Sequence, residues 1–354
     1  MPALTIQAPS RLHFGLLTWG DESPRRFGGV GLMVRDPGLE VVATPGESWG
    51  ATGPLAARVL AAAGRSARLL EDDGVAVPPL RFEVRSAPPE HVGLGVGTQV
   101  GMATARLVAE AAGLGGLAAP DLARLAGRGL RSGIGLHGFA HGGLIVDGGR
   151  GSGESAPVAP LLARLAFPSD WSVLVVIPPG QVGLHGVPEA RAFGQLPPPP
   201  ASTVDRLCRL VLLDLLPAVA EADLPGFGAA LAEAQALVGR GFAPAQGGQY
   251  ARPELAGLAE FLTAMGLVGV GQSSWGPTLY GFLNADPARE VAVSQRVIDR
   301  TGWPTGSAFW TRASPAGARL VRSAAAIPPG QIGEKRVHRQ DRDRASPDPP
   351  PTDG

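Results

Sequence analysis

Lysine is almost absent from this chain. Lys335 is its single lysine and stands near the C-terminus, so the 31 residues counted as Lys plus Arg are otherwise arginines. A P-loop needs a lysine after its glycines, and a protein kinase needs a strand lysine on its phosphates. A Schiff-base enzyme needs a lysine nucleophile as well. The sequence therefore excludes these three kinds of chemistry from its folded part.

The chain also has very little cysteine and no net charge. Cys208 is the one cysteine, which excludes a disulfide framework and a cysteine-built metal site and favours a reducing cytoplasm. The formal net charge at pH 7 is zero, which argues against a general nucleic-acid or membrane-surface role. The N-terminus has no signal-peptide pattern, and no apolar run reaches the ~20 residues of a membrane span. We therefore expect a cytoplasmic protein with no nucleic-acid or membrane partner.

Glycine and proline, in contrast, are abundant, at 51 and 35 of 354 residues, and periodic apolar segments alternate with them. The chain is long enough for two domains of ~100–200 residues each. Strand-like and helix-like segments are mixed, which favours an α+β fold of two layers. We place a domain boundary in the loop before Trp171, giving units 1–168 and 169–322. The charged, proline-rich tail at 323–354 is predicted to be disordered.

A glycine loop, HVGLGVGTQVGMA, lies between a strand-like segment and a helix-like one. Its glycines let the backbone approach a ligand closely, and the free amides and dipole of the following helix favour a phosphate or pyrophosphate. The dinucleotide-binding spacing G-x-G-x-x-G fails because Thr98 stands at the third glycine. A tight turn with a helix cap is the alternative interpretation. The predicted phosphate-binding residues are Gly93, Gly95, Gly97, Thr98 and Gln99.

Two histidines stand four residues apart in the segment RSGIGLHGFAHGGLIVDGG, residues 131–149. A zinc pair would require a continuous helix and a third ligand, whereas glycines surround both histidines and no third ligand is evident. We expect His137 to be catalytic and His141 to bind substrate, each donating a hydrogen bond to a phosphate or carboxylate. A buried structural histidine is the alternative for His141.

Three arginines are candidates for anion binding, because a guanidinium matches the geometry of carboxylate and phosphate groups. Arg11 and Arg131 are predicted to be catalytic, and Arg26 is predicted to bind substrate. Each could instead form a surface ion pair, which is the common role of an exposed arginine.

The second half of the sequence adds further candidates. The stretch GQSSWGP is a polar turn with a ring that could stack on an aromatic substrate, and its predicted substrate-binding residues are Gln272, Ser273, Ser274 and Trp275. The alternative for Trp275 is packing in the core. His185 and Glu189 are predicted to close the site from the second domain. Glu90, beside the glycine loop, is a candidate metal ligand, with a solvated loop carboxylate as the alternative.

Three motifs resemble those of the GHMP superfamily of small-molecule kinases: APSRLHFG at 8–15, PEHVGLGVGTQVGMA at 89–103 and VGVGQSSWGPTLYG at 268–281. The resemblance implies an N-terminal domain of the ribosomal-protein type, a C-terminal ferredoxin-like domain and a phosphate ligand over the glycine loop. GHMP kinases usually carry S-G-x-D, whose aspartate activates the hydroxyl that is phosphorylated. Here Gly135 stands at the aspartate position, which weakens a kinase interpretation.

The segments RRFGGVGLMV, RSGIGLHGFAHGGLIVDGG and IPPGQVGLHGVPEARAF resemble the β-ribofuranosylaminobenzene 5'-phosphate synthase branch of that superfamily. This resemblance implies a homodimeric enzyme that joins phosphoribosyl pyrophosphate to 4-aminobenzoate or 4-hydroxybenzoate early in tetrahydromethanopterin biosynthesis. Pyrophosphate and carbon dioxide are released, and Mg²⁺ is expected on the phosphates. Because carbon dioxide leaves in place of a proton, no aspartate base is needed. An ATP-dependent GHMP kinase and a non-catalytic nucleotide-binding regulator remain the alternatives, and the choice of benzoate stays open.

Overall fold

The computed structural model describes residues 2–20, 25–151 and 158–323. The predicted disordered tail therefore lies outside the described residues from 324 onward. Helices and strands alternate along the chain, so the predicted α+β class is confirmed. No helix in the described ranges is both long and apolar enough to cross a membrane.

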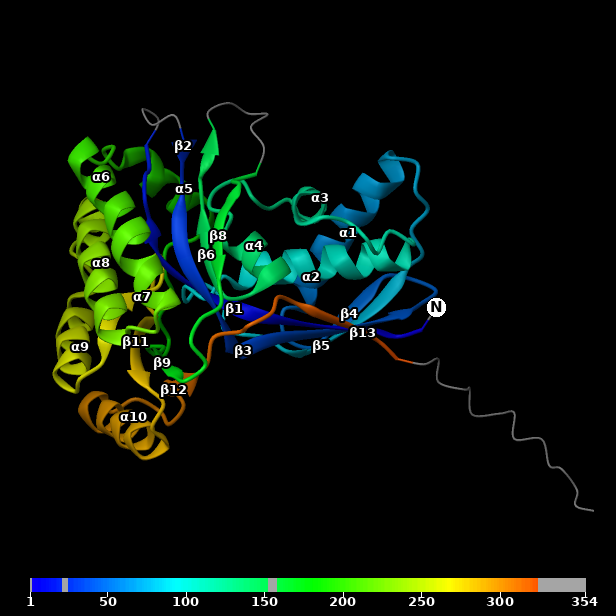
Figure 1. Ribbon diagram of the computed structural model, residues 1–354. Coiled ribbons are helices and arrows are strands. Elements are labelled where there is room, and N and C mark those ends of the chain that lie inside the picture. The colour runs from blue at the N-terminus through cyan, green and yellow to red at the C-terminus, as the bar shows by residue number, and fades with distance from the viewer. Residues whose placement is uncertain (1, 21–24, 152–157, 324–354) are drawn as a thin grey trace, which may run out of the picture.

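The first unit is a layer of strands covered by helices on one face (Figure 1). Its strands are β1 (Leu4–Leu16), β2 (Arg25–Arg26), β3 (Gly29–Pro45), β4 (Gly50–Thr52), β5 (Leu80–Ser86), β6 (Leu144–Asp147), β7 (Arg150–Gly151) and β8 (Leu161–Leu165). Its helices are α1 (Ala56–Asp72), α2 (Val96–Ala111), α3 (Ala119–Ala126) and α4 (Ile134–His141). The large sheet runs in the order β13-β1-β3-β5-β4, where β13 is the last strand of the chain (Arg319–Arg322). In the same sheet β6 pairs with β3 and β8 pairs with β6, and β2 pairs with β7 separately.

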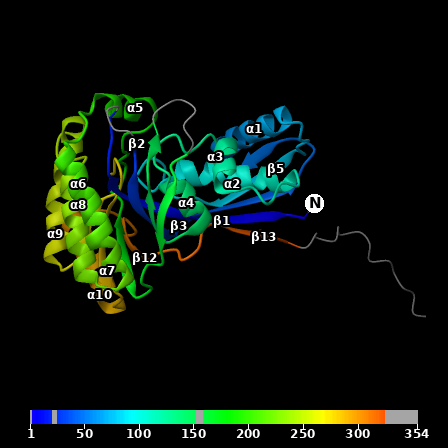
Figure 2. The same cartoon turned by 45° about the horizontal axis from the view of Figure 1, so that its top comes forward.

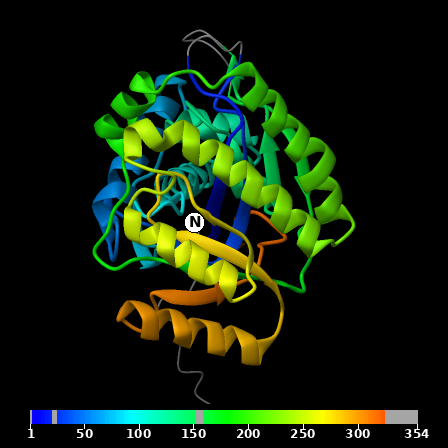
Figure 3. The ribbon, with the colours of Figure 1, turned by 90° about the vertical axis from the view of Figure 1, so that its left-hand side faces the viewer.

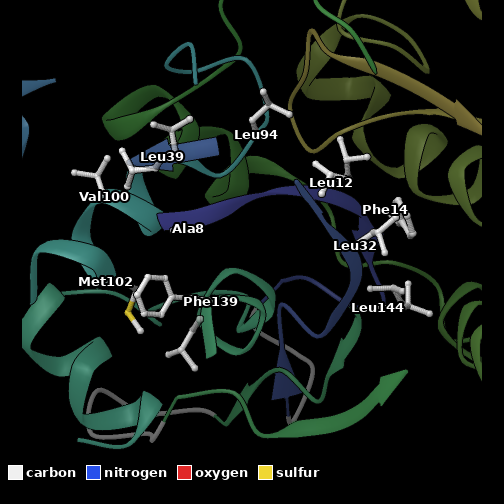
Figure 4. Packing of buried hydrophobic residues seen from close by; sticks show 14 of the residues in the cluster. Ala8, Leu12, Phe14, Leu32, Leu39, Leu94, Val100, Met102, Phe139 and Leu144 are labelled. Carbon is white, nitrogen blue, oxygen red and sulfur yellow. The ribbon is translucent and has the colours of Figure 1, made fainter. Parts of the chain in front are cut away.

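The long strands β1 and β3 form the centre of this unit. They pair antiparallel over most of their length, with Leu12 opposite Leu32. Figure 4 shows buried side chains of β1, β3 and β6 packed with α2 and α4, including Met102 and Phe139. Leu12, Leu32 and Met102 are completely buried, and burial of such side chains contributes ~1.5–3 kcal/mol each. This core fixes where α2 begins relative to β1.

The second unit begins with β9 (Trp171–Val176). It continues with α5 (Gly186–Gln195), α6 (Ala201–Arg209), the π-helical turn η1 (Leu210–Leu215), α7 (Leu216–Ala220), α8 (Leu224–Gln246), α9 (Pro253–Ala264), β10 (Val268–Gln272), β11 (Leu279–Asn284), α10 (Pro287–Thr301) and β12 (Ala308–Thr311). Its antiparallel sheet has the order β10-β11-β9-β12. Figure 3, which looks onto this side of the molecule, shows α8 and α9 in front of the strands. Leu255 and Leu262 of α9 pack into a core with Leu174 of β9.

The two units are joined by more than one crossing of the chain. The chain leaves the first sheet after β8 and enters the second at β9, close to the predicted boundary. The final strand, β13 (Arg319–Arg322), then returns to the first sheet and pairs with β1, with Arg322 opposite Leu4. Residues Arg319–Arg322, which the prediction placed in the second unit at 169–322, therefore extend the sheet of the first unit.

Candidate active site

A cavity of about 540 Å³ lies between the two units. It is bordered by β1, the glycine loop, the N-terminus of α2, the segment after α3, helix α5 and the turn after β10. Of the residues predicted from the sequence, it is lined by Arg11, Gly93, Gly95, Gly97, Thr98, Arg131, His185, Glu189, Gln272, Ser274 and Trp275. It therefore collects candidates from all three motifs in one place.

The glycine loop has the backbone geometry that its sequence predicts. Gly95 is the residue before α2 and has a φ of 72°, in the left-handed region. A side chain at Gly93 would clash with the carbonyl oxygen of Ser273, so the loop passes directly against the turn after β10. The amides of Thr98 and Gln99 donate to the carbonyl oxygen of Gly95 at 3.0 and 3.2 Å. The amides of Val96 and Gly97 are therefore the ones that a ligand could reach at this end of α2.

Two residues predicted to contact substrate instead hold the loop in place. The side-chain amide of Gln99 donates to the carbonyl oxygen of Gly135 at 2.9 Å and is buried. The hydroxyl of Ser273 donates to the carbonyl oxygen of Gly93 at 2.7 Å and accepts from the amide of His13 at 3.0 Å. Neither side chain lines the cavity. In the structure these two side chains position the glycine loop, and their predicted contact with a ligand has no support from their position.

Arginines surround the start of α2. A Cβ atom at Gly95 would lie 3.1 Å from Nε of Arg11. Burial lowers the pKa of Arg11 to about 10, with Glu189 raising it and Arg131 lowering it further. Arg131 pairs with Glu189 at 2.9 Å. Because the pKa of Arg11 stays well above neutrality, this part of the cavity is cationic and suits an anionic ligand.

Arg26 and Glu90 do not line the cavity. Arg26 lies on β2, opposite Arg150 of β7, so the prediction that it binds substrate is not supported by its position. The carboxylate of Glu90 forms an ion pair with Nε of Arg58 at 2.9 Å. The arginine would compete with a metal ion for this carboxylate. No group of three or more His, Cys, Asp or Glu residues suited to a metal ion occurs in the described parts of the chain.

Aromatic side chains form another part of the cavity lining. Phe193 of α5 contacts Phe27 at 5.4 Å between ring centroids and Trp275 at 5.1 Å, both edge to face. Trp275 stacks on Phe242 at 4.7 Å. The guanidinium carbon of Arg131 lies 5.4 Å from the centroid of Phe193, which joins the aromatic and cationic parts. Figure 2 shows α5, the helix that carries Phe193, beside β2, which Phe27 directly follows.

The two histidines of segment 131–149 do not line the cavity, although both were predicted to contact a ligand. They lie on the short helix α4, whose last residue is His141 and which Gly142 caps. Nε2 of His137 is 2.8 Å from the carbonyl oxygen of Ala159, and burial lowers the pKa of its ring. His141 is exposed. Neither lines the cavity, so the rotation of α4 gives His137 a structural role and leaves the predicted catalytic role without support.

His13, Ser132 and Asp147 form a hydrogen-bonded chain that starts at the cavity. The amide of Gly15 donates to Nδ1 of His13 at 3.2 Å, and burial holds the pKa of His13 well below its usual range. The ring is therefore neutral, and Nε2 donates to the hydroxyl of Ser132 at 3.3 Å. That hydroxyl donates to Asp147 at 2.8 Å. None of these three residues was among those predicted for the site from the sequence.

Asp147 is the fixed end of this chain. It is fully buried and also accepts from the amides of Gly133 and Gly149 at 2.9 and 2.8 Å. Burial raises its pKa to about 6, although these hydrogen bonds oppose the rise. Three donors on one carboxylate hold the backbone next to Arg131 in a defined position. The pattern VDGG after an apolar strand was the available signal for this anchor.

Gly135 stands where GHMP kinases usually keep an aspartate. A Cβ atom there would lie 3.0 Å from Cγ2 of Thr98. A side chain at this position would therefore be in tight contact with Thr98 in the first turn of α2, which would have to move by a few tenths of an ångström.

Comparison with solved structures shows which fold this chain shares. Homoserine kinase from Cytophaga hutchinsonii aligns with a TM-score of 0.60 at 16% identity, covering 91% of this chain and 98% of that one. Mevalonate diphosphate decarboxylase from Enterococcus faecalis aligns with a TM-score of 0.59 at 14% identity, covering 91% and 99%. The family GHMP kinases C terminal matches residues 215–294. The predicted two-domain GHMP-superfamily fold is thereby confirmed.

Sequence relatives narrow this class to one family. A protein of Methanothermobacter thermautotrophicus named beta-ribofuranosylphenol 5'-phosphate synthase is 34% identical, covering 83% of this chain and 93% of the relative. A protein of Archaeoglobus fulgidus with the same name is 36% identical, covering 80% and 88%. The chain belongs to the β-ribofuranosylphenol 5'-phosphate synthase family.

Proposed function

We propose that this protein is an arylribosyl phosphate synthase. It joins phosphoribosyl pyrophosphate to a 4-substituted benzoate and releases pyrophosphate and carbon dioxide. The observation that carries this proposal is the composition of one cavity, in which arginines around the N-terminus of α2 adjoin the aromatic wall of Phe27, Phe193 and Trp275. A phosphorylated sugar and an aromatic acid are the two ligand types that these surfaces suit.

The reaction forms a carbon–carbon bond at the ribose. The ring carbon that bears the carboxylate attacks C1, and the C1–O bond breaks with its electron pair leaving on pyrophosphate. The carboxylate then leaves as carbon dioxide, and its electron pair restores the aromatic ring. Because no proton has to be removed from carbon, the position of Gly135 needs no base. This agrees with the close approach of Thr98 to Gly135, which leaves little room for a side chain there.

The side chains have distinct tasks in this scheme. The amides of Val96 and Gly97 and the guanidinium of Arg11 bind phosphate oxygens and stabilise the leaving group. Arg131, held by Glu189 and lying over Phe193, orients the carboxylate of the aromatic acid. Phe193 and Trp275 exclude water from the ring. His13 stays neutral. Its hydrogen bond to Ser132 helps to hold the backbone beside Arg131 in position.

Magnesium is expected with the phosphates, whose oxygens supply part of its ligands. The described residues contain no cluster of three potential ligands, and Glu90, the candidate ligand, pairs with Arg58. We propose that any Mg²⁺ enters with phosphoribosyl pyrophosphate, as part of the substrate.

The relatives' name refers to a ribofuranosylphenol, which supports 4-hydroxybenzoate as the acid. The test is incubation with phosphoribosyl pyrophosphate and either 4-hydroxybenzoate or 4-aminobenzoate, with detection of the arylribosyl phosphate by mass spectrometry. The expected result is product formation with 4-hydroxybenzoate. Phosphorylation of an alcohol by ATP, with no arylribosyl product from either acid, would instead identify a kinase.

A further inference from the structure

Arg128 is a partly buried cation for which the described residues offer no partner. It lines the cavity in the segment after α3. No hydrogen bond or ion pair to its side chain occurs among the residues that the structure describes, and its Nε is buried without a partner. Burial lowers its pKa, and the nearby guanidinium groups of Arg58, Arg65 and Arg131 lower it further. Like charges close together at a cavity repel one another, and a bound anion would relieve this repulsion.

The side chain of Arg128 lies in a slot on α2 formed by two glycines. A Cβ atom at Gly101 would lie 3.2 Å from Nε of Arg128, and one at Gly97 would lie 3.5 Å from its Nη2. Gly97 and Gly101 are one helical turn apart, so the side chain runs along the helix toward its N-terminus. Its guanidinium therefore lies beside the first turn of α2.

Arg58 approaches the same turn from α1. A Cβ atom at Gly97 would lie 2.9 Å from its Nη1. Its Nε pairs with Glu90, which fixes the side chain and leaves the Nη1 side toward α2. Two guanidinium groups thus lie on the side of Gly97 where a Cβ atom would be, in the first turn of α2. Arg11 lies at Gly95 instead, and contacts the loop at a separate position.

We propose that Arg58 and Arg128, together with the amides of Val96 and Gly97, form the binding site for the diphosphate group. This inference rests on the proposed function and adds two residues that the motifs did not indicate. Two guanidinium forks and two amides offer donors for oxygens on both phosphorus atoms, whereas a single phosphate group would use one fork. The two arginines supply the positive charge that the leaving pyrophosphate needs without a metal ion held by the protein.

The direct test is binding of inorganic pyrophosphate measured by calorimetry in EDTA. Wild-type protein is compared with Arg58→Gln and Arg128→Gln, and Arg124→Gln is the matched control. Arg124 is an exposed arginine of α3 that pairs with Asp73 outside the cavity. We expect at least about tenfold weaker binding in each test variant, since a lost charged hydrogen bond costs ~1.5–3 kcal/mol. The control should bind as wild type does.

Several results would overturn the assignment. These are equal affinity in Arg128→Gln and wild type, loss of wild-type binding in EDTA, or a larger effect of Arg128→Gln on ribose 5-phosphate than on pyrophosphate. Circular dichroism and thermal unfolding check that the variants fold. Arg128→Lys keeps the positive charge but loses the paired N–H donors of the guanidinium. It should bind pyrophosphate with an affinity between those of wild type and Arg128→Gln.

These experiments distinguish a failure of the proposed binding site from a failure of the proposed function. If wild-type protein binds pyrophosphate through Arg128 yet makes no arylribosyl product, the proposed function fails and the binding site stands. If product forms and Arg128→Gln changes neither the pyrophosphate affinity nor KM for phosphoribosyl pyrophosphate, the binding site fails alone.

Discussion

Removal of the buried carboxylate at Asp147 should change how stability depends on pH. Its pKa is about 6 in the folded protein against an ordinary value of 3.8. The folded state therefore binds the proton more tightly than the unfolded state does. Through this group, the free energy of unfolding is highest at low pH and falls as pH rises toward and through about 6. The full difference is ~3 kcal/mol, at about 1.36 kcal/mol per pKa unit.

Asp147→Asn removes this titration. Between about pH 4.5 and pH 7.5, linkage makes the wild type lose ~2 kcal/mol through Asp147 that the variant does not lose. The variant also loses part of the acceptor set for Ser132, Gly133 and Gly149, a cost of ~1–3 kcal/mol that is the same at both pH values. The relative stability of the variant should therefore improve at the higher pH.

Urea unfolding at the two pH values measures this difference. Asp73→Asn, which removes an exposed carboxylate of the first unit, serves as the control for general effects of charge. If the stability gap between wild type and Asp147→Asn is equal at both pH values, Asp147 does not carry the raised pKa and the reasoning fails.

Three further variants test the site. Gly135→Asp should lower the free energy of unfolding by ~1–3 kcal/mol because its Cβ would crowd Thr98, and ATP-dependent assays should detect no phosphorylation of alcohols. His137→Ala should cost ~1–3 kcal/mol in urea unfolding, since Ala159 loses its partner, and KM for both substrates should stay as in wild type. Trp275→Leu should raise KM for the aromatic acid and not for phosphoribosyl pyrophosphate; an equal rise in both would contradict the aromatic wall as the acid's binding surface.

The sequence predicts those parts of the site that depend on local backbone geometry. The glycine loop lies before α2 as its pattern requires, and Arg11 reaches it because β1 runs alongside. The turn after β10 supplies Gln272, Ser274 and Trp275 to the cavity as expected. These residues belong to motifs in which spacing along the chain largely fixes position in space.

The residues missed by sequence reasoning depend on packing between distant elements. Arg58 lies in an alanine-rich helix where an arginine is typical of the surface, and Arg128 follows α3 without any motif. They meet only because α1 and the segment after α3 both pack against the glycine face of α2. In the same way, the direction in which His137 points depends on how α4 is rotated about its axis. The four-residue spacing of the two histidines does not determine that rotation.

The central claim is tested most directly by the stoichiometry of the reaction. Pyrophosphate, carbon dioxide and arylribosyl phosphate are measured together with phosphoribosyl pyrophosphate and carboxyl-labelled 4-hydroxybenzoate. The account predicts equal amounts of all three, each dependent on the aromatic acid. Release of pyrophosphate without the aromatic acid, or an arylribosyl product that keeps the labelled carboxylate, would contradict it.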